Sequence, residues 1–249
     1  MEKPKILVIG DSCIDEFVYC DVERICPEAP VPVLNPIKSS TNPGMASNVV
    51  ENLKSLGAEV DIITNKDIIK KTRYIDIRSG QMVMRVDEND TCKSLPKNKY
   101  NKGVGRCHDA IIISDYCKGF LTEEDIAIFA ERKTCPIFLD TKKQLGDWCK
   151  NIDFIKINEF EHKKNFERLP NYPFILDKMI VTIGSKGCKY KNRTYPVPEV
   201  SVKDVSGAGD TFLAALVVDY LKNNNIKTAI KFANKCSTKV VQKRGVAII

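Results

Sequence analysis

The stretch DVSGAGDTF, residues 204–212, decides how the rest of the chain is interpreted. Its small residues at 207–209 allow the backbone to pass close to another group. Apolar side chains then recur at helical spacing as far as Leu221, which predicts a helix. The unpaired amides at such a helix start, together with the helix dipole, form an anion site. Two interpretations are open at this point: a phosphate-holding turn with Asp210 as a catalytic carboxylate, or an ordinary helix start favoured by an acid.

Short apolar runs alternate with predicted helices along most of the chain. Such runs are typical of parallel strands that are buried on both faces. We predict strands at residues 5–11, 59–64, 109–116, 135–141, 152–159 and 178–187, a hairpin at 189–198, and helices at 44–58, after Thr122, from about Ala208 and from about Ile226. Strands that alternate with helices indicate an α/β fold, a three-layer α/β/α sandwich with a mostly parallel central sheet.

Two segments depart from this pattern and predict a second, smaller sheet. Residues 16–38 are rich in strand-forming residues but contain four prolines, which are tolerated at sheet edges and strand starts. Residues 72–87 have the pattern of a hairpin with its turn at Ser79-Gly80. We therefore expect a single domain over residues 1–249, in which these two segments form a small β-sheet lid.

The composition is that of an ordinary globular protein. Hydrophobic residues make up 43% and charged residues 29% of the chain, so disorder is not indicated. The net charge of +7 is not gathered in one long basic block. We interpret it as a solvated surface and expect no nucleic-acid partner. No apolar stretch approaches the length of a membrane span, so we expect no membrane partner.

Ten cysteines suggest a disulfide or metal framework, but no C-x-x-C occurs and there are only two histidines. Free, mostly buried thiols in a reducing compartment are the simpler expectation. The first residues, MEKPKILVIGD, lead directly into a predicted strand. This predicts a chain without a signal peptide and a cytoplasmic location.

With these elements in place, the sequence resembles the ribokinase-type (PfkB) carbohydrate kinases. DVSGAGDTF is similar to the D-T-x-G-A-G-D signature of that family. The resemblance implies that Asp210 is the general base, and that its own amide joins an anion hole formed by Gly207, Ala208 and Gly209. The chemistry fits, because a positioned carboxylate takes the proton of a sugar hydroxyl while helix-start amides stabilise the charge of the transferring phosphoryl group.

A second motif concerns the nucleotide. NEFE, residues 158–161, matches the family's N-x-x-E, which helps to place Mg²⁺ and the ATP phosphates, partly through water. The resemblance thus implies that Asn158 belongs to the nucleotide site and Glu161 to the Mg²⁺ site. Taken alone, the same four residues describe a helix N-cap followed by a surface acid.

Further residues match positions near ATP in the family. They are Thr182, Gly184 and Gly187 of TIGSKG, and Asn234 of FANKC beside the adenine. A plain β-turn is the alternative for the first three, and a polar residue on a core helix for the last. Asp204 and Ser206 match positions that hold a monovalent cation, such as K⁺, in several relatives.

The sugar side of the family pattern lies near the N-terminus. Asp15 follows Gly10 at the spacing of the family's sugar-hydroxyl aspartate. PGMASN resembles P-G-G-x-x-N, so Gly44 and Asn48 match sugar contacts. Met45 departs from this pattern, since the family usually has a second glycine there that lets the backbone approach the sugar. On the residues alone, Met45 is a core filler on the following helix.

One stretch points to a particular sugar. RICPEAPVPVL, residues 24–34, resembles R-I-S-P-E-A-P-V-P-V of the heptose 7-phosphate 1-kinases, the kinase half of bacterial ADP-heptose synthase. SDYCKGFL and LDTKK resemble further segments of that subgroup, so Lys118 and Lys142 match lysines that suit a phosphorylated substrate. A surface charge is the alternative for each lysine.

The chain is shorter than typical relatives. ITNKDIIKKTRY runs from a predicted core strand almost directly into the hairpin, where the family usually places a helix, a strand and another helix. We therefore expect one sheet edge to be less covered. In relatives the lid also pairs subunits, so the resemblance implies a homodimer through the lid.

These resemblances predict an ATP-dependent sugar kinase that phosphorylates the anomeric hydroxyl of D-glycero-D-manno-heptose 7-phosphate to the 1,7-bisphosphate. Its cofactors would be ATP and Mg²⁺, with K⁺ as a further candidate. Two alternatives stay open: the same chemistry on another sugar or sugar phosphate, and a non-catalytic sugar- or nucleotide-binding relative.

Overall fold

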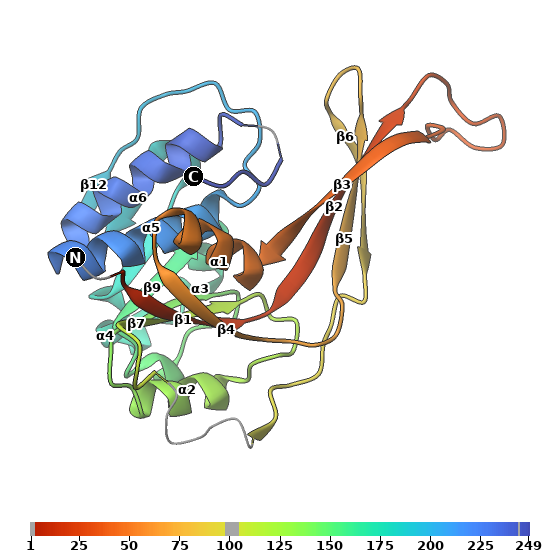
Figure 1. The fold of residues 1–249 in the computed structure, drawn as a ribbon. Coiled ribbons are helices and arrows are strands. Elements are labelled where there is room, and N and C mark those ends of the chain that lie inside the picture. Colours follow the sequence, from red (N-terminus) through yellow and green to blue (C-terminus); the bar gives the residue numbers. More distant parts are fainter. Residues whose placement is uncertain (1–2, 98–104, 244) are drawn as a thin grey trace.

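A central sheet of eight strands runs through the middle of the molecule (Figure 1). The computed structural model describes residues 3–97, 105–243 and 245–249. The strand order is β12-β11-β10-β9-β8-β7-β1-β4. The strands are β1 Lys5–Gly10, β4 Glu59–Thr64, β7 Ala110–Asp115, β8 Ile137–Thr141, β9 Phe154–Asn158, β10 Met179–Thr182, β11 Cys188–Tyr190 and β12 Arg193–Tyr195. Pairing is parallel from β4 to β10 and antiparallel only in the β10-β11-β12 meander, so the prediction of a mostly parallel sheet is confirmed.

Helices cover both faces of this sheet. They are α1 Ala46–Ser55, α2 Glu123–Glu131, α3 Glu159–Asn165, α4 Pro173–Leu176, α5 Ala208–Asn223 and α6 Ile226–Val240. Side chains alternate along β1, so Ile6 and Val8 join the core with α1, α5 and α6, whereas Leu7 and Ile9 join the core with α2 and α4. The three-layer sandwich is therefore confirmed. None of the helices in the described part of the chain combines the length and hydropathy needed to cross a bilayer.

The helix starts follow from local sequence. Thr122 caps α2 through a capping box with Asp125, as its position before two glutamates predicts. Asn225 caps α6 by accepting from the amides of Lys227 and Thr228. Gly207 precedes α5 with a φ of 77°, in the left-handed region that glycine tolerates best.

A second sheet of four strands projects away from the sandwich (Figure 1). Its order is β3-β2-β5-β6, with β2 Ser12–Asp21, β3 Asn35–Met45, β5 Lys70–Asp76 and β6 Met82–Glu88. The expected small sheet is thus present, and β5 and β6 form the expected hairpin. One detail differs: β2 is an inner strand between β3 and β5. It avoids the prolines because Pro27, Pro30 and Pro32 all lie in the connection to the edge strand β3.

The shortened connection after β4 leaves that strand at the edge of the central sheet. Residues 65–69 lead from β4 to β5 without an intervening helix or strand. Ile62 on β4 is 39% exposed and Ile68 is 65% exposed. The expectation of a less covered sheet edge is therefore confirmed.

Candidate active site

Asp210 lies in the first turn of α5, at the end of the central sheet where β1, β7, β8 and β9 have their carboxyl ends. Open α/β sheets bind ligands at this end. The turn before the helix is tightly packed: a Cβ on Gly207 would lie 2.8 Å from Asn48 Nδ2. Gly207 is thus required by its positive φ and by the close approach of α1. The sequence-predicted Asp210 and Asn48, from distant parts of the chain, are brought into direct contact.

Two donors hold the buried Asp210 carboxylate. Asn48 Nδ2 donates to Oδ2 at 2.8 Å, and the Tyr116 hydroxyl donates to Oδ1 at 2.6 Å. Burial raises the pKa of Asp210 to about 6, although both hydrogen bonds act to lower it. A carboxylate with this pKa is ionised at neutral pH and close enough to it to accept a proton, as a general base must. Tyr116 was not among the predicted site residues.

The anion hole predicted at Gly207, Ala208 and Gly209 needs one refinement. The Ala208 amide donates to Val205 O at 3.2 Å, and the Thr211 amide donates to Gly207 O at 2.9 Å. The amides between them, at Gly209 and Asp210, are those that a helix start leaves without an intrahelical acceptor. Of the predicted amides, only that of Ala208 is thus taken up by a backbone acceptor outside the helix within the described part of the chain, and those of Gly207, Gly209 and Asp210 remain for an anion.

A buried ion pair lies against this helix start. Lys156 Nζ on β9 is 2.7 Å from Asp140 Oδ2 on β8, and a Cβ on Gly209 would lie 3.0 Å from the same ammonium nitrogen. Burial acts to lower the pKa of Lys156, but the Asp140 carboxylate outweighs it and the pKa is raised. Lys156 therefore keeps a positive charge beside the positive end of α5. Neither residue was predicted as part of the site, because each lies inside a predicted core strand.

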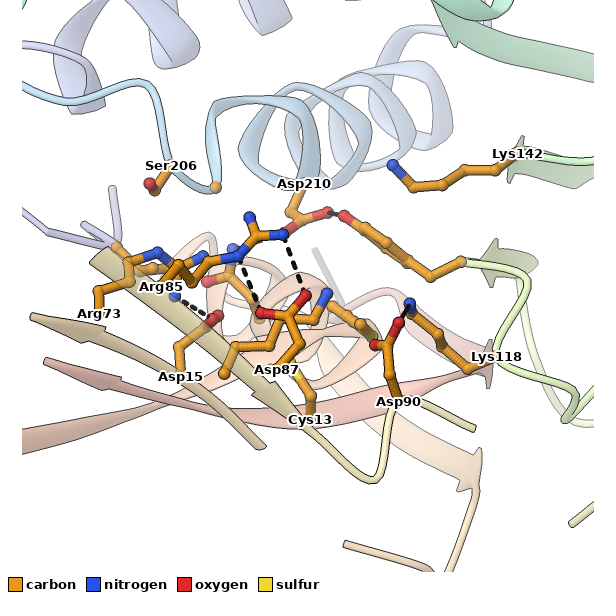
Figure 2. A pocket seen from close by; sticks show the side chains of 16 residues that line it. Cys13, Asp15, Arg73, Arg85, Asp87, Asp90, Lys118, Lys142, Ser206 and Asp210 are labelled. Carbon is orange, nitrogen blue, oxygen red and sulfur yellow. Dashed lines mark hydrogen bonds and ion pairs between the residues drawn. The ribbon is translucent and has the colours of Figure 1, made fainter. Parts of the chain in front are cut away.

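A polar pocket of about 410 Å³ opens in front of Asp210 (Figure 2). Its charged lining consists of five cations and four acids: Lys71, Arg73, Arg85, Lys118, Lys142, Asp15, Asp87, Asp90 and Asp210. Side-chain alternation builds one wall, because Lys71 and Arg73 on β5 pair across the hairpin with Asp87 and Arg85 on β6. The sandwich and the small sheet thus both contribute to one pocket.

The predicted sugar contacts Asp15 and Gly44 lie side by side. Asp15 on β2 forms an ion pair with Arg73 at 2.5 Å, drawn in Figure 2. A Cβ on Gly44 would overlap the side-chain ends of Asp15 and Cys13, so a larger residue at position 44 would have to displace the Asp15 carboxylate. Cys13 lines the same pocket, but burial and the neighbouring Asp15 raise the pKa of its thiol to about 12, which makes it a poor nucleophile.

The two predicted lysines differ in their surroundings. Lys118 is paired with Asp90 at 2.5 Å and its side chain is 16% exposed. Lys142 is 46% exposed, with its ammonium 4.8 Å from the centre of the Tyr116 ring and 3.7 Å from Glu161 Oε1. Lys71, which was not predicted, has no acid within 4 Å among the described residues, and burial lowers its pKa. Within the described residues, Lys71 is thus the ammonium group without an acid partner, whereas Lys118 and Lys142 each have one.

Met45 adopts a backbone conformation that glycine tolerates best. Its φ is 56° and its ψ is −128°, and it is the N-cap of α1 rather than a residue on that helix. The side chain is buried with Cys13 and Ile69 and lines the pocket. The methionine therefore combines apolar burial with a strained backbone.

This strain predicts an unusual order of stabilities. Met45→Gly and Met45→Ala both lose the buried side chain, but only glycine relieves the positive φ. Met45→Gly should therefore be more stable than Met45→Ala by about 1 kcal/mol in urea unfolding. The Val49→Gly and Val49→Ala pair within α1 is the control, where alanine should be the more stable by about 0.5–1 kcal/mol. If the alanine variant were the more stable one at position 45 as well as at position 49, the backbone at Met45 would not be strained.

A buried carboxylate that the sequence analysis missed shapes the loop that carries Tyr116 and Lys118. Asp11, 1% exposed, accepts hydrogen bonds from the amides of Tyr116, Lys118 and Phe120. Burial and the nearby Asp115 raise the pKa of Asp11. Asp11 thus fixes the backbone of SDYCKGFL, which explains how that segment directs Tyr116 at Asp210.

Asn158 and Glu161 contact each other at the start of α3. Glu161 accepts from the amide and the side chain of Asn158, at 2.8 and 2.9 Å, and its own amide donates to Asn158 Oδ1. Asn158 is therefore a helix N-cap. Glu161 is only 6% exposed, so the alternative of a surface acid is wrong. Two carboxylate oxygens with lone pairs left over are suited to hold water around a cation.

The residues predicted near ATP and its adenine also have roles within the fold, in a turn and in hydrogen bonds to backbone carbonyls. Gly187 has a φ of 88°, and a Cβ there would overlap Tyr195 O, so the β10–β11 turn requires glycine. Gly184 has a φ of 58° and faces open space. Thr182 donates to Ile157 O at 3.3 Å, and Asn234 on α6 donates to Tyr195 O at 2.9 Å. These bonds are compatible with either sequence interpretation.

Asp204 and Ser206 lie in the loop before α5. Asp204 Oδ1 accepts from the Ser206 amide at 2.8 Å, and Oδ2 accepts from the Gly245 amide at 3.1 Å. The loop is thereby tied to the C-terminal segment. Within the described residues, no group of three or more His, Cys, Asp or Glu side chains is arranged to hold a metal ion.

Comparison with known proteins agrees with this geometry. The bifunctional protein HldE of a Nitratiruptor species is 34% identical, over 98% of this chain and 63% of the relative. HldE of Campylobacter jejuni strain RM1221 is 30% identical, over 98% of this chain and 62% of the relative. The chain thus spans a little under two thirds of the length of these relatives.

Solved structures show the same fold at low sequence identity. A ribokinase from Thermotoga maritima superposes with a TM-score of 0.72 at 17% identity, covering 98% of this chain and 94% of the other. Phosphofructokinase-2 from Escherichia coli, in complex with potassium, gives a TM-score of 0.74 at 14% identity, covering 100% and 95%. The fold is therefore ribokinase-like.

The sequence profile of the pfkB family carbohydrate kinases matches residues 88–249, which include Asp210 and the turn before it. This match covers most of the chain and contains the helix start, the buried carboxylate and the N-x-x-E pair described above. The chain therefore belongs to the pfkB family of carbohydrate kinases.

Proposed function

We propose that this kinase transfers the γ-phosphoryl group of ATP to the anomeric hydroxyl of D-glycero-D-manno-heptose 7-phosphate, giving the 1,7-bisphosphate. The observation that carries the proposal is the buried Asp210 carboxylate at the start of α5, which faces a pocket lined by five cations. The choice of a heptose rests on residues 24–34 and on the similarity to HldE relatives.

In the proposed reaction the sugar hydroxyl oxygen forms a bond to the γ-phosphorus as the bond to the β,γ-bridging oxygen breaks. The hydroxyl proton passes to Asp210, which Asn48 and Tyr116 hold in place. The amides of Gly209 and Asp210 and the Lys156 ammonium stabilise negative charge on the transferring group. ADP, the leaving group, takes the electron pair of the broken bond.

We assign the nucleotide to the start of α3, the β10–β11 turn and α6. Mg²⁺, when bound with ATP, neutralises phosphate charge. Asn158 and Glu161 suit a water-mediated contact with it, because Mg²⁺ usually retains several waters. We assign contacts with ATP to Thr182, Gly184 and Gly187, a contact with its adenine to Asn234, and a monovalent cation such as K⁺ to Asp204 and Ser206.

On the sugar side, we assign hydroxyl contacts to Asp15, Gly44 and Asn48. The substrate's own phosphate is assigned to the ammonium groups of Lys71, Lys118 and Lys142, since these line the same pocket as Asp15 and Asn48. The small sheet acts as a lid that excludes water, because Arg73 and Arg85 reach the pocket from it. A homodimer through the small sheet and a cytoplasmic location complete the proposal, in which residues 1–249 form one domain.

The test of the substrate is an ATP-consumption assay with heptose 7-phosphate, ribose, fructose, fructose 6-phosphate and the unphosphorylated heptose, each at equal concentration. The proposal expects the largest kcat/KM for heptose 7-phosphate and a 1,7-bisphosphate product, identified by ³¹P NMR. A larger kcat/KM for any other sugar would assign the same site to that sugar.

Removing Lys71 tests the phosphate subsite. Lys71→Met should raise the KM for heptose 7-phosphate about tenfold, since one charge-assisted hydrogen bond contributes about 1.5–3 kcal/mol. The KM for the unphosphorylated heptose should change much less. Lys66→Met, at a residue outside this pocket, is the control. A parallel rise for both sugars would remove Lys71 from the phosphate subsite.

A further inference from the structure

The base is held on both of its oxygens by neutral donors that lie outside the stretch DVSGAGDTF. Tyr116 donates to Oδ1 and Asn48 donates to Oδ2. An ionised carboxylate has about four acceptor positions, so two remain for a sugar hydroxyl. Two donors on opposite oxygens fix the plane of the carboxylate, which is the geometric requirement for a general base.

The Asn48 amide is itself oriented by a chain of buried side chains that returns to α5. The Thr211 hydroxyl donates to Asn52 Oδ1 at 2.9 Å, and Asn52 Nδ2 donates to Asn48 Oδ1 at 3.2 Å. Asn52 Nδ2 also donates to Asn48 O at 2.9 Å. If this chain ran in reverse, Asn48 Oδ1 would face the Asp210 carboxylate, acceptor against acceptor. The direction from Thr211 through Asn52 to Asn48 is therefore the one that the carboxylate supports.

Burial makes the loss of any of these bonds costly for the ionised base. Thr211 and Asn52 are 0% exposed and Asn48 is 2% exposed, so solvent does not replace a lost donor readily. On the other side, Asp11 holds the amide of Tyr116 at 2.7 Å, and burial keeps the pKa of the phenol well above its ordinary value. Tyr116 therefore remains a donor throughout the pH range in which Asp210 titrates.

Other charged and titratable groups face Asp210 without hydrogen-bonding to it among the described residues. From the packed elements they are Lys156 on β9, Asp140 on β8 and Cys13 on β2. On the open side the pocket adds five cations and three acids: Lys71, Arg73, Arg85, Lys118, Lys142, Asp15, Asp87 and Asp90. These groups act at longer range than the two direct donors and are unchanged by the substitutions used below.

We propose that Tyr116 and the chain of Thr211, Asn52 and Asn48 form a positioning device that holds Asp210 oriented and ionised for phosphoryl transfer. The role of Asp210 as the base rests on the proposed function. None of the three residues Tyr116, Asn52 and Thr211 needs to touch the phosphoryl group. Their effect reaches the reaction through the protonation and orientation of one carboxylate.

The experiment is a titration of Asp210 in protein labelled with ¹³C-aspartate, without substrate. Its carboxyl resonance is assigned by its loss in Asp210→Asn. Tyr116→Phe keeps the ring and removes one donor, so the pKa of Asp210 should rise by about one unit or more, as expected for a hydrogen bond to a charged group. Thr211→Val should shift it in the same direction by less. Tyr172→Phe, at a tyrosine remote from the pocket, should leave it unchanged.

The same variants give a second readout in turnover. The acid limb of the kcat/KM profile should move to higher pH in Tyr116→Phe, and the lost rate should recover as pH rises. A 3-fluorotyrosine placed at position 116 is a stronger donor and should move the Asp210 titration in the opposite direction. Asp210 titrations that do not move in Tyr116→Phe and in the fluorinated protein would overturn the proposal. Undiminished turnover by Asp210→Asn would instead overturn the proposed base and leave the titration result standing.

Discussion

Asp210→Asn is expected to lower phosphoryl transfer by about 100- to 10,000-fold, the usual contribution of a positioned general base. Asparagine fills the same space: its one oxygen can accept from Asn48, and its amide nitrogen can donate to the Tyr116 hydroxyl oxygen. It has no basic lone pair with which to take the sugar proton. The measurement is steady-state ATP consumption with the best substrate, and the loss should appear mainly in kcat rather than in KM.

The pH dependence of the unsubstituted enzyme belongs to the same prediction. Because burial raises the pKa of Asp210 to about 6, the rate should fall as pH decreases through about 6, where the base becomes protonated. The acid limb should be absent from the residual activity of Asp210→Asn. An acid limb that persists unchanged in that variant would assign it to another group.

Stability provides the control, and its sign follows from the same pKa. The folded-state value of about 6 lies above the ordinary value of 3.8, so the folded protein binds the extra proton between these values. The contribution of Asp210 to stability therefore decreases as pH rises from about 4 to 6 and stays unfavourable above that. Asp210→Asn removes this cost. It should be at least as stable as the parent protein at neutral pH in thermal unfolding, so lost activity cannot be attributed to unfolding.

The elements of the sandwich were predictable because each buried strand is a short apolar run that ends at residues typical of turns or helix starts. The run 5–11 is an example. Its alternate residues point into the two cores on opposite faces of the sheet, so an unbroken apolar run indicates a strand that is covered on both faces. The start of α5 was predictable from its glycines. The inner position of β2 was not, because pairing partners are set by the hairpin β5–β6 far along the chain.

Within the site, the resemblance supplied Asp210, Asn48 and Asp15, but not their partners. Tyr116 was present in a quoted motif, SDYCKGFL, yet its direction depends on the three amides that Asp11 collects. Residues 71, 73, 85 and 87 carried a usable signal, since charged side chains at alternate positions of a predicted hairpin share one face. Which face meets the sandwich is a tertiary property, and no local pattern encodes it.

Lys156 and Asp140 are the clearest case of a site feature hidden in core strands, and they support the prediction with the largest effect on stability. Their side chains are 7% and 11% exposed, and they pair at 2.7 Å. Lys156→Met should lower the free energy of unfolding by about 3–5 kcal/mol, because it leaves a buried carboxylate without its counter-charge. The measurement is urea unfolding monitored by the single tryptophan, Trp148.

Two further variants test whether the loss of stability comes from the unpaired charge or from any substitution in strand β9. Lys156→Met combined with Asp140→Leu removes both charges, and it should recover most of the lost stability, since apolar replacement of a buried pair is often neutral. Lys163→Met breaks the surface pair with Glu159, whose side chains are 72% and 59% exposed, and should change stability by about 0.5 kcal/mol or less. A double variant as unstable as Lys156→Met would contradict the role of the unpaired charge. The recovered double variant, which lacks the ammonium beside Gly209, should fold but transfer phosphate more slowly, because the helix start then stabilises the transferring group alone.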